Sequence, residues 1–251
     1  MTANKKTAQG LPEPDQGIEA IVLAGGFGTR LREVVNNVPK SMALVNGRPF
    51  LEYLLDYLAS QKIERVVLSV GYKHEFIRNH FGNRYRSLEI AYAIEKEPMG
   101  TGGGIRLSFW KIVGPRAIVL NGDSIFRIDL AALHDYHLKK KADVTLALRK
   151  LANTGRYGRV KLNNRRRILA FEEKNEAAGP GLINAGVYVM EKAFLMDPAF
   201  RGKFSIEKDC FEKFLETSLM FGQPLQGYFL DIGIPGDYQK AQHDFKGFKD
   251  R

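Results

Sequence analysis

The first half of the chain alternates between two kinds of hydrophobic pattern. Four short apolar runs are typical of buried parallel strands, at residues 18–24, 65–70, 88–94 and 116–123. Apolar residues at helical spacing predict helices between these runs, at 50–59, at 73–81 and near 106–110. Strands that alternate with helices predict a mostly parallel sheet with helices on both faces, which is an α/β fold.

The pattern changes after about residue 140. Further strands are predicted at 142–150, at two segments of 158–174 around an Asn163-Asn164 turn, at 182–190 and at 226–230. Helices are predicted at 206–217 and from Pro235 onward. We therefore expect one domain, residues 18–251, in which 141–251 add antiparallel or mixed strands over the edge of the sheet formed by 18–140. Residues 1–17 contain lysines without a following apolar core, so they predict a disordered arm and no signal peptide.

Composition and charge exclude several classes of protein. Hydrophobic residues make up 44% of the 251 residues, and no apolar run is long enough for a membrane span. Cys210 is the single cysteine, which excludes an intrachain disulfide and predicts a reducing, cytoplasmic setting. The net charge of +10 is spread over short runs without interleaved aromatics. This distribution favours solvated faces and small anionic substrates over nucleic acid.

Polar and glycine-rich segments follow the predicted strands, at 23–40, 95–104, 121–124 and 229–237. Ligands of an open parallel sheet bind beyond the carboxyl ends of its strands. The four segments therefore predict one shared site at that edge of the sheet.

The first segment, LAGGFGTRLREVVNNVPK, combines flexible backbone with positive charge. Gly25, Gly26 and Gly28 permit close approach of backbone N–H groups to an anion. Arg30 offers a planar fork for phosphate oxygens and Lys40 a mobile point charge. Neither the G-x-x-x-x-G-K-[ST] nor the G-x-G-x-x-G pattern is present. Taken alone, the segment fits a phosphate site or a plain surface loop.

Carboxylates at strand ends suggest a metal site. Asp123 follows an apolar strand, where it could hold Mg²⁺ or instead cap a following helix. Asp231 also follows a strand, and two such carboxylates could share one ion and bridge it to a triphosphate. Asp237 is predicted in the first turn of a helix. The histidines show no metal spacing, and His134 and His137 are predicted on a helix surface.

Seven motifs occur in order between about residues 18 and 238: LAGGFGTRLR, VPKSM, EPMGTGGGIR, LNGDS, FEEK, NAGVY and DIGIPGDY. Together they resemble the sugar-1-phosphate nucleotidyltransferase family. The resemblance implies the Rossmann-like, three-layer fold of nucleotide-diphospho-sugar transferases, with nucleotide binding in residues 18–140 and sugar-phosphate binding in 141–251. It also implies attack by a sugar-phosphate oxygen on the α-phosphorus of a nucleoside triphosphate, with Mg²⁺ as cofactor and pyrophosphate as leaving group.

The same resemblance assigns roles to individual residues. Arg30 would grip the triphosphate, Lys40 the α-phosphate, and Lys174 the sugar phosphate. The metal would be held by Asp123 and Asp231. The nucleotide would contact Leu23, Ala24, Gly25, Gly26, Gly28, Thr29, Glu95, Gly100, Thr101 and Gly122. The sugar would face Glu173, Asn184 and Gly186, although Glu173 and Lys174 also fit an exposed ion pair. Ile234 and Asn175 depart from the residues common in the family, but neither touches a proposed ligand.

The choice of substrates rests on narrower features. The resemblance implies that the residue shortly before the G-T-[AG]-G turn, here Glu95, lies along the edge of the base. A carboxylate there suits the N1–H and N2–H₂ donors of guanine, with Glu97 as a rival and an exposed strand-end charge as the alternative. VPKSMALVNGRPFLEYLLDYL resembles the branch of the family that transfers GMP from GTP to D-glycero-α-D-manno-heptose 1-phosphate, which makes GDP-heptose. Transfer of GMP to a hexose 1-phosphate such as mannose 1-phosphate, transfer of UMP, and a non-catalytic nucleotide-sugar sensor remain alternatives. A glycosyltransferase is disfavoured because no D-x-D motif follows the early strands, and the sequence leaves monomer and dimer open.

Overall fold

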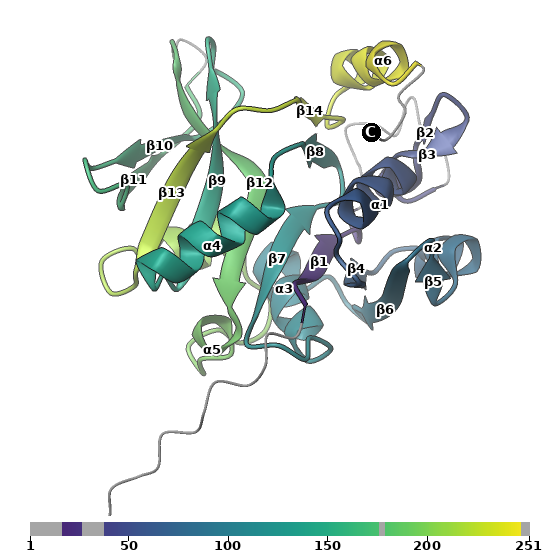
Figure 1. The fold of residues 1–251 in the computed structure, drawn as a ribbon, viewed down its shortest axis with the longest axis horizontal. Helices are drawn as coiled ribbons and strands as arrows, with labels where there is room; N and C mark the ends of the chain where they lie inside the picture. The colour runs from purple at the N-terminus through teal and green to yellow at the C-terminus, as the bar shows by residue number, and fades with distance from the viewer. Residues whose placement is uncertain (1–16, 27–37, 176–178, 247–251) are drawn as a thin grey trace, which may run out of the picture.

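The computed structural model describes residues 17–26, 38–175 and 179–246. Within these ranges, a ten-stranded sheet has the order β11-β10-β12-β7-β1-β4-β6-β5, and β9 pairs with both β12 and β13 (Figure 1). The sheet strands are β1 (Glu19–Leu23), β4 (Arg65–Val70), β5 (Arg84–Tyr85), β6 (Leu88–Ile94), β7 (Arg116–Asn121), β9 (Val144–Leu151), β10 (Arg159–Leu162), β11 (Ile168–Glu172), β12 (Gly181–Glu191) and β13 (Met220–Leu225). Two small ribbons pair β2 (Leu44–Val45) with β3 (Arg48–Pro49) and β8 (Ser124–Phe126) with β14 (Phe229–Asp231).

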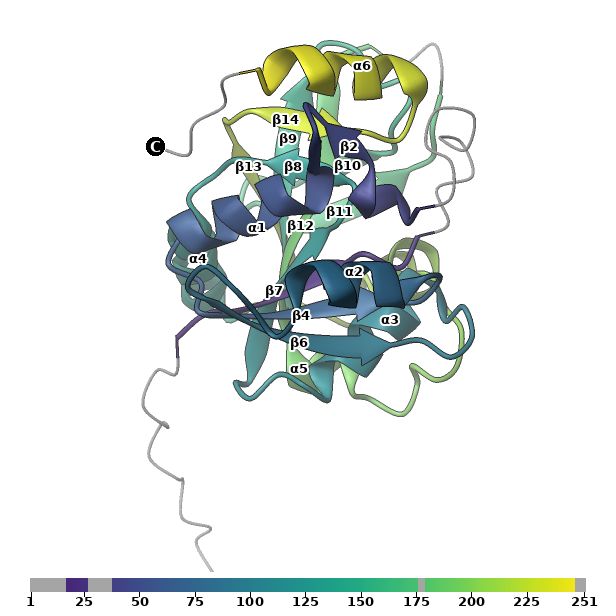
Figure 2. The ribbon, with the colours of Figure 1, turned by 90° about the vertical axis from the view of Figure 1, so that its right-hand side faces the viewer.

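Helices cover both faces of the sheet. They are η2 (Lys40–Met42), α1 (Phe50–Ser60), α2 (His74–Phe81), α3 (Gly100–Phe109), α4 (Leu130–Lys140), α5 (Lys192–Leu195), η3 (Ile206–Glu212) and α6 (Pro235–Asp244). Figure 2 shows α1 and α2 above β6. Buried residues of α1 and α2 belong to one hydrophobic core, and those of α3 belong to the other. Among the described residues, no helix combines the length and the apolar character that crossing a membrane requires.

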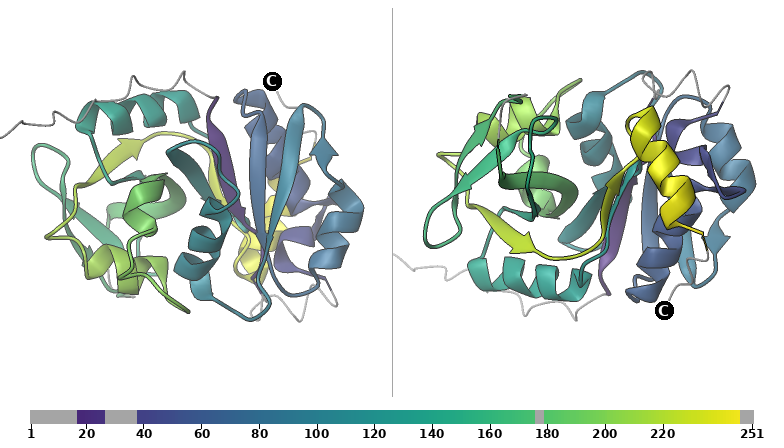
Figure 3. Two further views of the ribbon diagram at one scale, coloured as in Figure 1. Left: turned by 90° about the horizontal axis from the view of Figure 1, so that it is seen from below. Right: turned by 90° about the horizontal axis from the view of Figure 1, so that it is seen from above.

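The centre of the sheet is parallel, as predicted. β1 runs parallel to β4 and β7, and β4 runs parallel to β6. The second half of the chain continues this sheet, because β12 pairs antiparallel with β7. A bulge between Asn184 and Tyr188 marks where β12 leaves β7 and turns toward β10. Figure 3 shows the resulting two groups of strands, which meet at β7 and β12. The added strands thus extend the sheet rather than lie over its edge.

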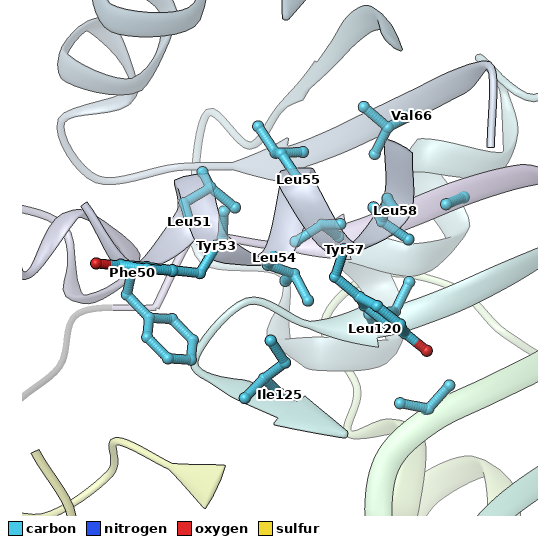
Figure 4. Close-up of a cluster of buried hydrophobic side chains, with 14 of the residues drawn as sticks. Phe50, Leu51, Tyr53, Leu54, Leu55, Tyr57, Leu58, Val66, Leu120 and Ile125 are labelled. Atoms are coloured by element: carbon cyan, nitrogen blue, oxygen red, sulfur yellow. The ribbon is translucent and has the colours of Figure 1, made fainter. Parts of the chain in front are cut away.

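Alternating side chains of β1 enter two separate cores. Ala20 and Val22 lie in the core beneath α1, whereas Ile21 lies in the core that α3 and η3 cover. Figure 4 shows the leucines of α1 in one cluster with Val66 and Leu120 of the sheet. An apolar run that is buried on both faces is the pattern that identified β1 as a central strand.

Helix α3 differs from the sequence prediction. It begins at Gly100, well before the predicted start near residue 106, and it contains a run of glycines. A Cβ at Gly102 would lie 2.1 Å from the ring of Phe204, and a Cβ at Gly104 would lie 2.8 Å from Glu95 Oε1. The glycines therefore let the helix pack closely against its neighbours, and this packing outweighs their poor intrinsic helix propensity.

Other predictions near α4 and at the end of the chain were also wrong. His134 and His137 are buried, at 7% and 1% exposure, and do not lie on a helix surface. The predicted helix 206–217 is the short η3 followed by turns. The predicted strand at 226–230 shifts to β14, and the preceding strand β13 was missed because Gly222, Gln223 and Pro224 interrupt its apolar pattern.

Candidate active site

The carboxyl ends of β1 and β7 lie side by side at the centre of the site. The backbone N–H of Gly122 donates a 2.9 Å hydrogen bond to the carbonyl oxygen of Leu23. A Cβ at Gly122 would lie 2.5 Å from that same oxygen, which leaves room only for glycine. Gly122 therefore holds the following residue, Asp123, against the end of the first strand.

The β8–β14 ribbon brings a second carboxylate to Asp123. Asp231 is the register partner of Ser124, and the N–H of Ile232 donates to the carbonyl oxygen of Asp123 at 2.9 Å. Because Asp123 precedes β8 and no helix starts there, the alternative that it caps a helix is wrong. Two carboxylates that are remote in sequence thus share one location.

Lys40 of η2 lies between these carboxylates. Its Nζ is 2.6 Å from Asp123 Oδ2 and 3.9 Å from Asp231 Oδ1, and its side chain is only 13% exposed. Burial and the charge of Asp123 raise the pKa of Asp231 above its usual range, although Lys40 opposes this shift. The cluster therefore places two carboxyl groups around one lysine side chain.

The pair of carboxylates fits a hard divalent cation. No group of three or more His, Cys, Asp or Glu side chains suited to a metal occurs within residues 17–26, 38–175 and 179–246. Mg²⁺, however, commonly takes one or two protein carboxylates and fills its other positions with substrate phosphates and water. Asp123 and Asp231 supply such a donor set, and the repulsion between them favours a cation.

A cavity of about 690 Å³ opens on one side of Asp123. Besides Lys40 and Asp123, it collects the described residues that were predicted to bind the nucleotide: Leu23, Ala24, Gly25, Gly26, Glu95, Gly100, Thr101 and Gly122. Three further predicted residues, Gly28, Thr29 and Arg30, lie outside the described residues. Glycines and strand ends form part of this wall.

Glu95 is a fixed carboxylate in the wall of this first cavity. Its Oε2 accepts a 2.8 Å hydrogen bond from the backbone N–H of Met99, and its Oε1 lies 3.4 Å from Ser69 Oγ. Glu95 is only partly exposed, so it is not the freely exposed charge considered as an alternative. Glu97 is exposed and also lines the cavity, so it stays a rival for contact with the base.

A second cavity, of about 730 Å³, opens on the other side of Asp123. It collects Lys174, Asp231 and the predicted sugar-binding residues Glu173, Asn184 and Gly186. The two cavities share Gly26, Lys40, Thr101, Asn121 and Asp123. Two ligands placed in them would therefore meet at Lys40 and Asp123.

Gly186 and Asn184 shape the bulge of β12 beside the second cavity. Gly186 has a φ of +73°, and a Cβ there would lie 2.5 Å from Asn121 Nδ2. Its N–H donates to Asn184 Oδ1 at 3.0 Å. Glycine at 186 is thus required by its backbone conformation and by its contact with Asn121.

Several residues of the second cavity were missed in the sequence. Tyr157 and Arg159 come from the loop after β9 and from β10, and Glu207 and Lys208 come from η3. Lys208 Nζ lies 3.3 Å from Glu173 Oε1, in an ion pair with both side chains mostly exposed. No local pattern marks these positions, because tertiary contacts alone bring η3 to the cavity. Asp237 does lie in the first turn of α6, as predicted.

Residues 19–246 match the Nucleotidyl transferase family, so the chain belongs to that family. The chain is 44% identical over 231 residues to the D-glycero-alpha-D-manno-heptose 1-phosphate guanylyltransferase of Aneurinibacillus thermoaerophilus, covering 92% of this chain and all of that protein. It is 40% identical to the enzyme of the same name from Campylobacter jejuni, over 88% of this chain and 97% of the relative.

A solved structure shares the fold over nearly the same span. HddC from Yersinia pseudotuberculosis, complexed with GMP-PN, superposes with a TM-score of 0.82 at 35% sequence identity. The match covers 92% of this chain and all of that one. The similarity therefore includes the strands that wall both cavities, and the predicted Rossmann-like fold and family resemblance are confirmed.

Proposed function

We propose that the protein transfers GMP from GTP to D-glycero-α-D-manno-heptose 1-phosphate, forming GDP-heptose and pyrophosphate. The observation that carries this proposal is the pair of cavities that meet at Lys40 and Asp123. A reaction between two phosphorylated substrates requires such a meeting point, where charge is neutralised and the reacting atoms are aligned. The guanylyltransferase relatives support GTP as the donor.

In the proposed reaction, an oxygen of the sugar phosphate attacks the α-phosphorus of GTP. A new bond between this oxygen and the α-phosphorus replaces the bond to the bridging oxygen, and pyrophosphate leaves with that electron pair. The attacking oxygen is already anionic, so no protein base is needed. Asp123 and Asp231 would hold Mg²⁺, which neutralises triphosphate charge when bound. Lys40 would neutralise the α-phosphate, Arg30 the rest of the triphosphate, and Lys174 would orient the sugar phosphate.

The proposed nucleotide lies in the first cavity, with its base at Glu95. This carboxylate offers acceptors to the two donor groups on the Watson–Crick edge of guanine. Its bond from Met99 N–H uses one lone pair of Oε2 and fixes the side chain. The proposed sugar phosphate lies in the second cavity, beside Lys174 and Asn184. Heptose as the acceptor is supported by the heptose 1-phosphate guanylyltransferase relatives.

A pyrophosphate-release matrix tests the proposal. The four nucleoside triphosphates are each paired with heptose, mannose, glucose and N-acetylglucosamine 1-phosphates, with Mg²⁺ present. We expect the highest kcat/KM for GTP with heptose 1-phosphate. Equal or faster turnover of mannose 1-phosphate would show that heptose 1-phosphate is not the preferred acceptor. A preference for UTP would show that GTP is not the preferred donor. Tight binding of GDP-heptose without pyrophosphate release in any pairing would favour the sensor alternative.

A further inference from the structure

Asn184 has no free donor to offer a sugar. Its Nδ2 donates to the hydroxyl of Tyr188 at 2.9 Å and to Glu207 Oε1 at 2.8 Å, which uses both amide hydrogens. Its Oδ1 accepts from Gly186 N–H at 3.0 Å. Exchanging the oxygen and nitrogen of the amide would turn the NH₂ group against this N–H, so the network fixes the orientation. Asn184 therefore orders the bulge and its neighbours.

Glu207 has acceptor capacity left over. A carboxylate has about four lone-pair sites, and the bond from Asn184 uses one of them. The side chain is exposed in the wall of the second cavity, which it shares with Asp231 and Lys174. Vicinal hydroxyls of a sugar are donors that a carboxylate can accept in pairs. Glu207 thus offers free hydrogen-bond acceptors to a ligand in the second cavity, whereas Asn184 has no free donor to offer.

The backbone that carries Glu207 is anchored to the first cavity. The N–H of Ile206 donates to Thr101 Oγ1 at 2.9 Å, and Phe204 exchanges backbone hydrogen bonds of 3.0 Å with Met99 and Gly102. Phe204 also packs where a Cβ of Gly102 would stand. These contacts hold the backbone at the start of η3 against α3, and the hydrogen bond from Asn184 orients the Glu207 carboxylate. A residue that selects among acceptors must be held in this way.

We propose that Glu207 selects the acceptor by accepting hydrogen bonds from hydroxyls of the sugar ring, and that Asn184 positions its carboxylate. This assignment rests on the proposed function, because it needs a sugar phosphate in the second cavity. In this proposal Glu207 determines the specificity for the sugar. Asn184 does not contact the sugar and instead positions the Glu207 carboxylate.

The test substitutes Glu207→Gln. Glutamine keeps an oxygen that can accept from Asn184, so the network and the melting temperature stay close to those of the unmodified protein. The sugar loses a charged acceptor, and we expect the KM for heptose 1-phosphate to rise about 10- to 100-fold. The KM for GTP should stay within about twofold. Glu216→Gln is the matched control, because Glu216 is exposed beyond η3 and lines neither cavity.

A set of mono-deoxy acceptors identifies the hydroxyl. The acceptor that lacks the contacted hydroxyl should react equally well with the unmodified protein and with the Gln variant, while the other acceptors retain the difference. An unchanged acceptor KM in the Gln variant, or an equal loss with every deoxy acceptor, would overturn the assignment.

Calorimetric titration of the four sugar 1-phosphates of the matrix separates this proposal from the proposed function. If the protein binds one of them without turnover, and Glu207→Gln weakens that binding at least tenfold, the transferase function fails and the Glu207 assignment stands. If turnover occurs and is insensitive to Glu207→Gln, the transferase function stands and the Glu207 assignment fails. Absence of binding to all four would overturn both.

Discussion

The two cavities on either side of Asp123 have walls of different kinds. The first is lined by strand ends and by five of the described glycines, together with side chains such as Tyr72, Glu95 and Lys96. The second is lined by charged side chains that already pair with one another, such as Arg159 with Glu172 and Glu173 with Lys208. Backbone N–H groups at glycines suit anions such as phosphates, whereas charged side chains offer donors and acceptors to hydroxyl groups. The two cavities therefore suit ligands of different chemistry.

The largest effect is expected where the halves meet. Asp123→Asn removes one of two carboxylates shared with Lys40, and we expect kcat to fall about 10³-fold because charge on the phosphates is no longer balanced. Steady-state pyrophosphate release measures this. Asp237→Asn is the control, since Asp237 pairs with Arg156 at 2.6 Å and lines neither cavity. Full turnover by the Asp123 variant would show that the two cavities do not share a reaction centre.

A backbone change at the same junction should affect stability. Gly122→Ala places a Cβ against the backbone of Leu23, which cannot move without disturbing β1. We expect the free energy of unfolding to fall by about 1–3 kcal/mol in urea denaturation. Gly236→Ala, in the first turn of α6 with nothing within 4 Å of the added atom, should be neutral or slightly stabilising. Equal stability of the two variants would contradict the close approach of β7 to β1.

Glu95→Gln changes the first cavity and leaves the second unchanged, because Glu95 lines only the first. Replacing one acceptor with an NH₂ donor should lower the ratio of kcat/KM for GTP over UTP about tenfold. The KM for the sugar 1-phosphate should not change. Competition between the two nucleotides in one reaction measures the ratio directly. If the ratio is unchanged, Glu95 does not contact the base, and Glu97→Gln becomes the next variant to measure.

The smallest effect is expected far from both cavities. Burial alone would raise the pKa of Glu191, but hydrogen bonds from His137 and Arg116 outweigh burial and lower it. A lowered pKa contributes stability above the unfolded value of about 4.3, and this contribution disappears as the pH falls through the folded value. Glu191→Gln should therefore cost about 1 kcal/mol at pH 7. The difference should shrink below about pH 4, as urea titrations at several pH values would show. A difference independent of pH would contradict the charge contribution.

The sequence predicted the first cavity better than the second. Continuous apolar runs identified β1, β4, β6 and β7, and the residues after them form the first cavity because parallel strands end at one edge. The second cavity depends on η3, which is placed by Thr101 and by the fit of Phe204 against Gly102. These contacts join distant segments, so no local period reveals them. The glycines of α3 were misplaced for the same reason, since their partners lie outside the helix.

The ribbon of β8 and β14 has a consequence for the order of folding. Its three-residue strands lie outside the main sheet, and β14 comes from a segment far along the chain from β8. Closing so long a loop costs entropy that a short ribbon recovers only after the sheet has brought its ends together. We therefore expect Asp231 to join Asp123 late in folding, after the sheet that ends beside the first cavity has formed.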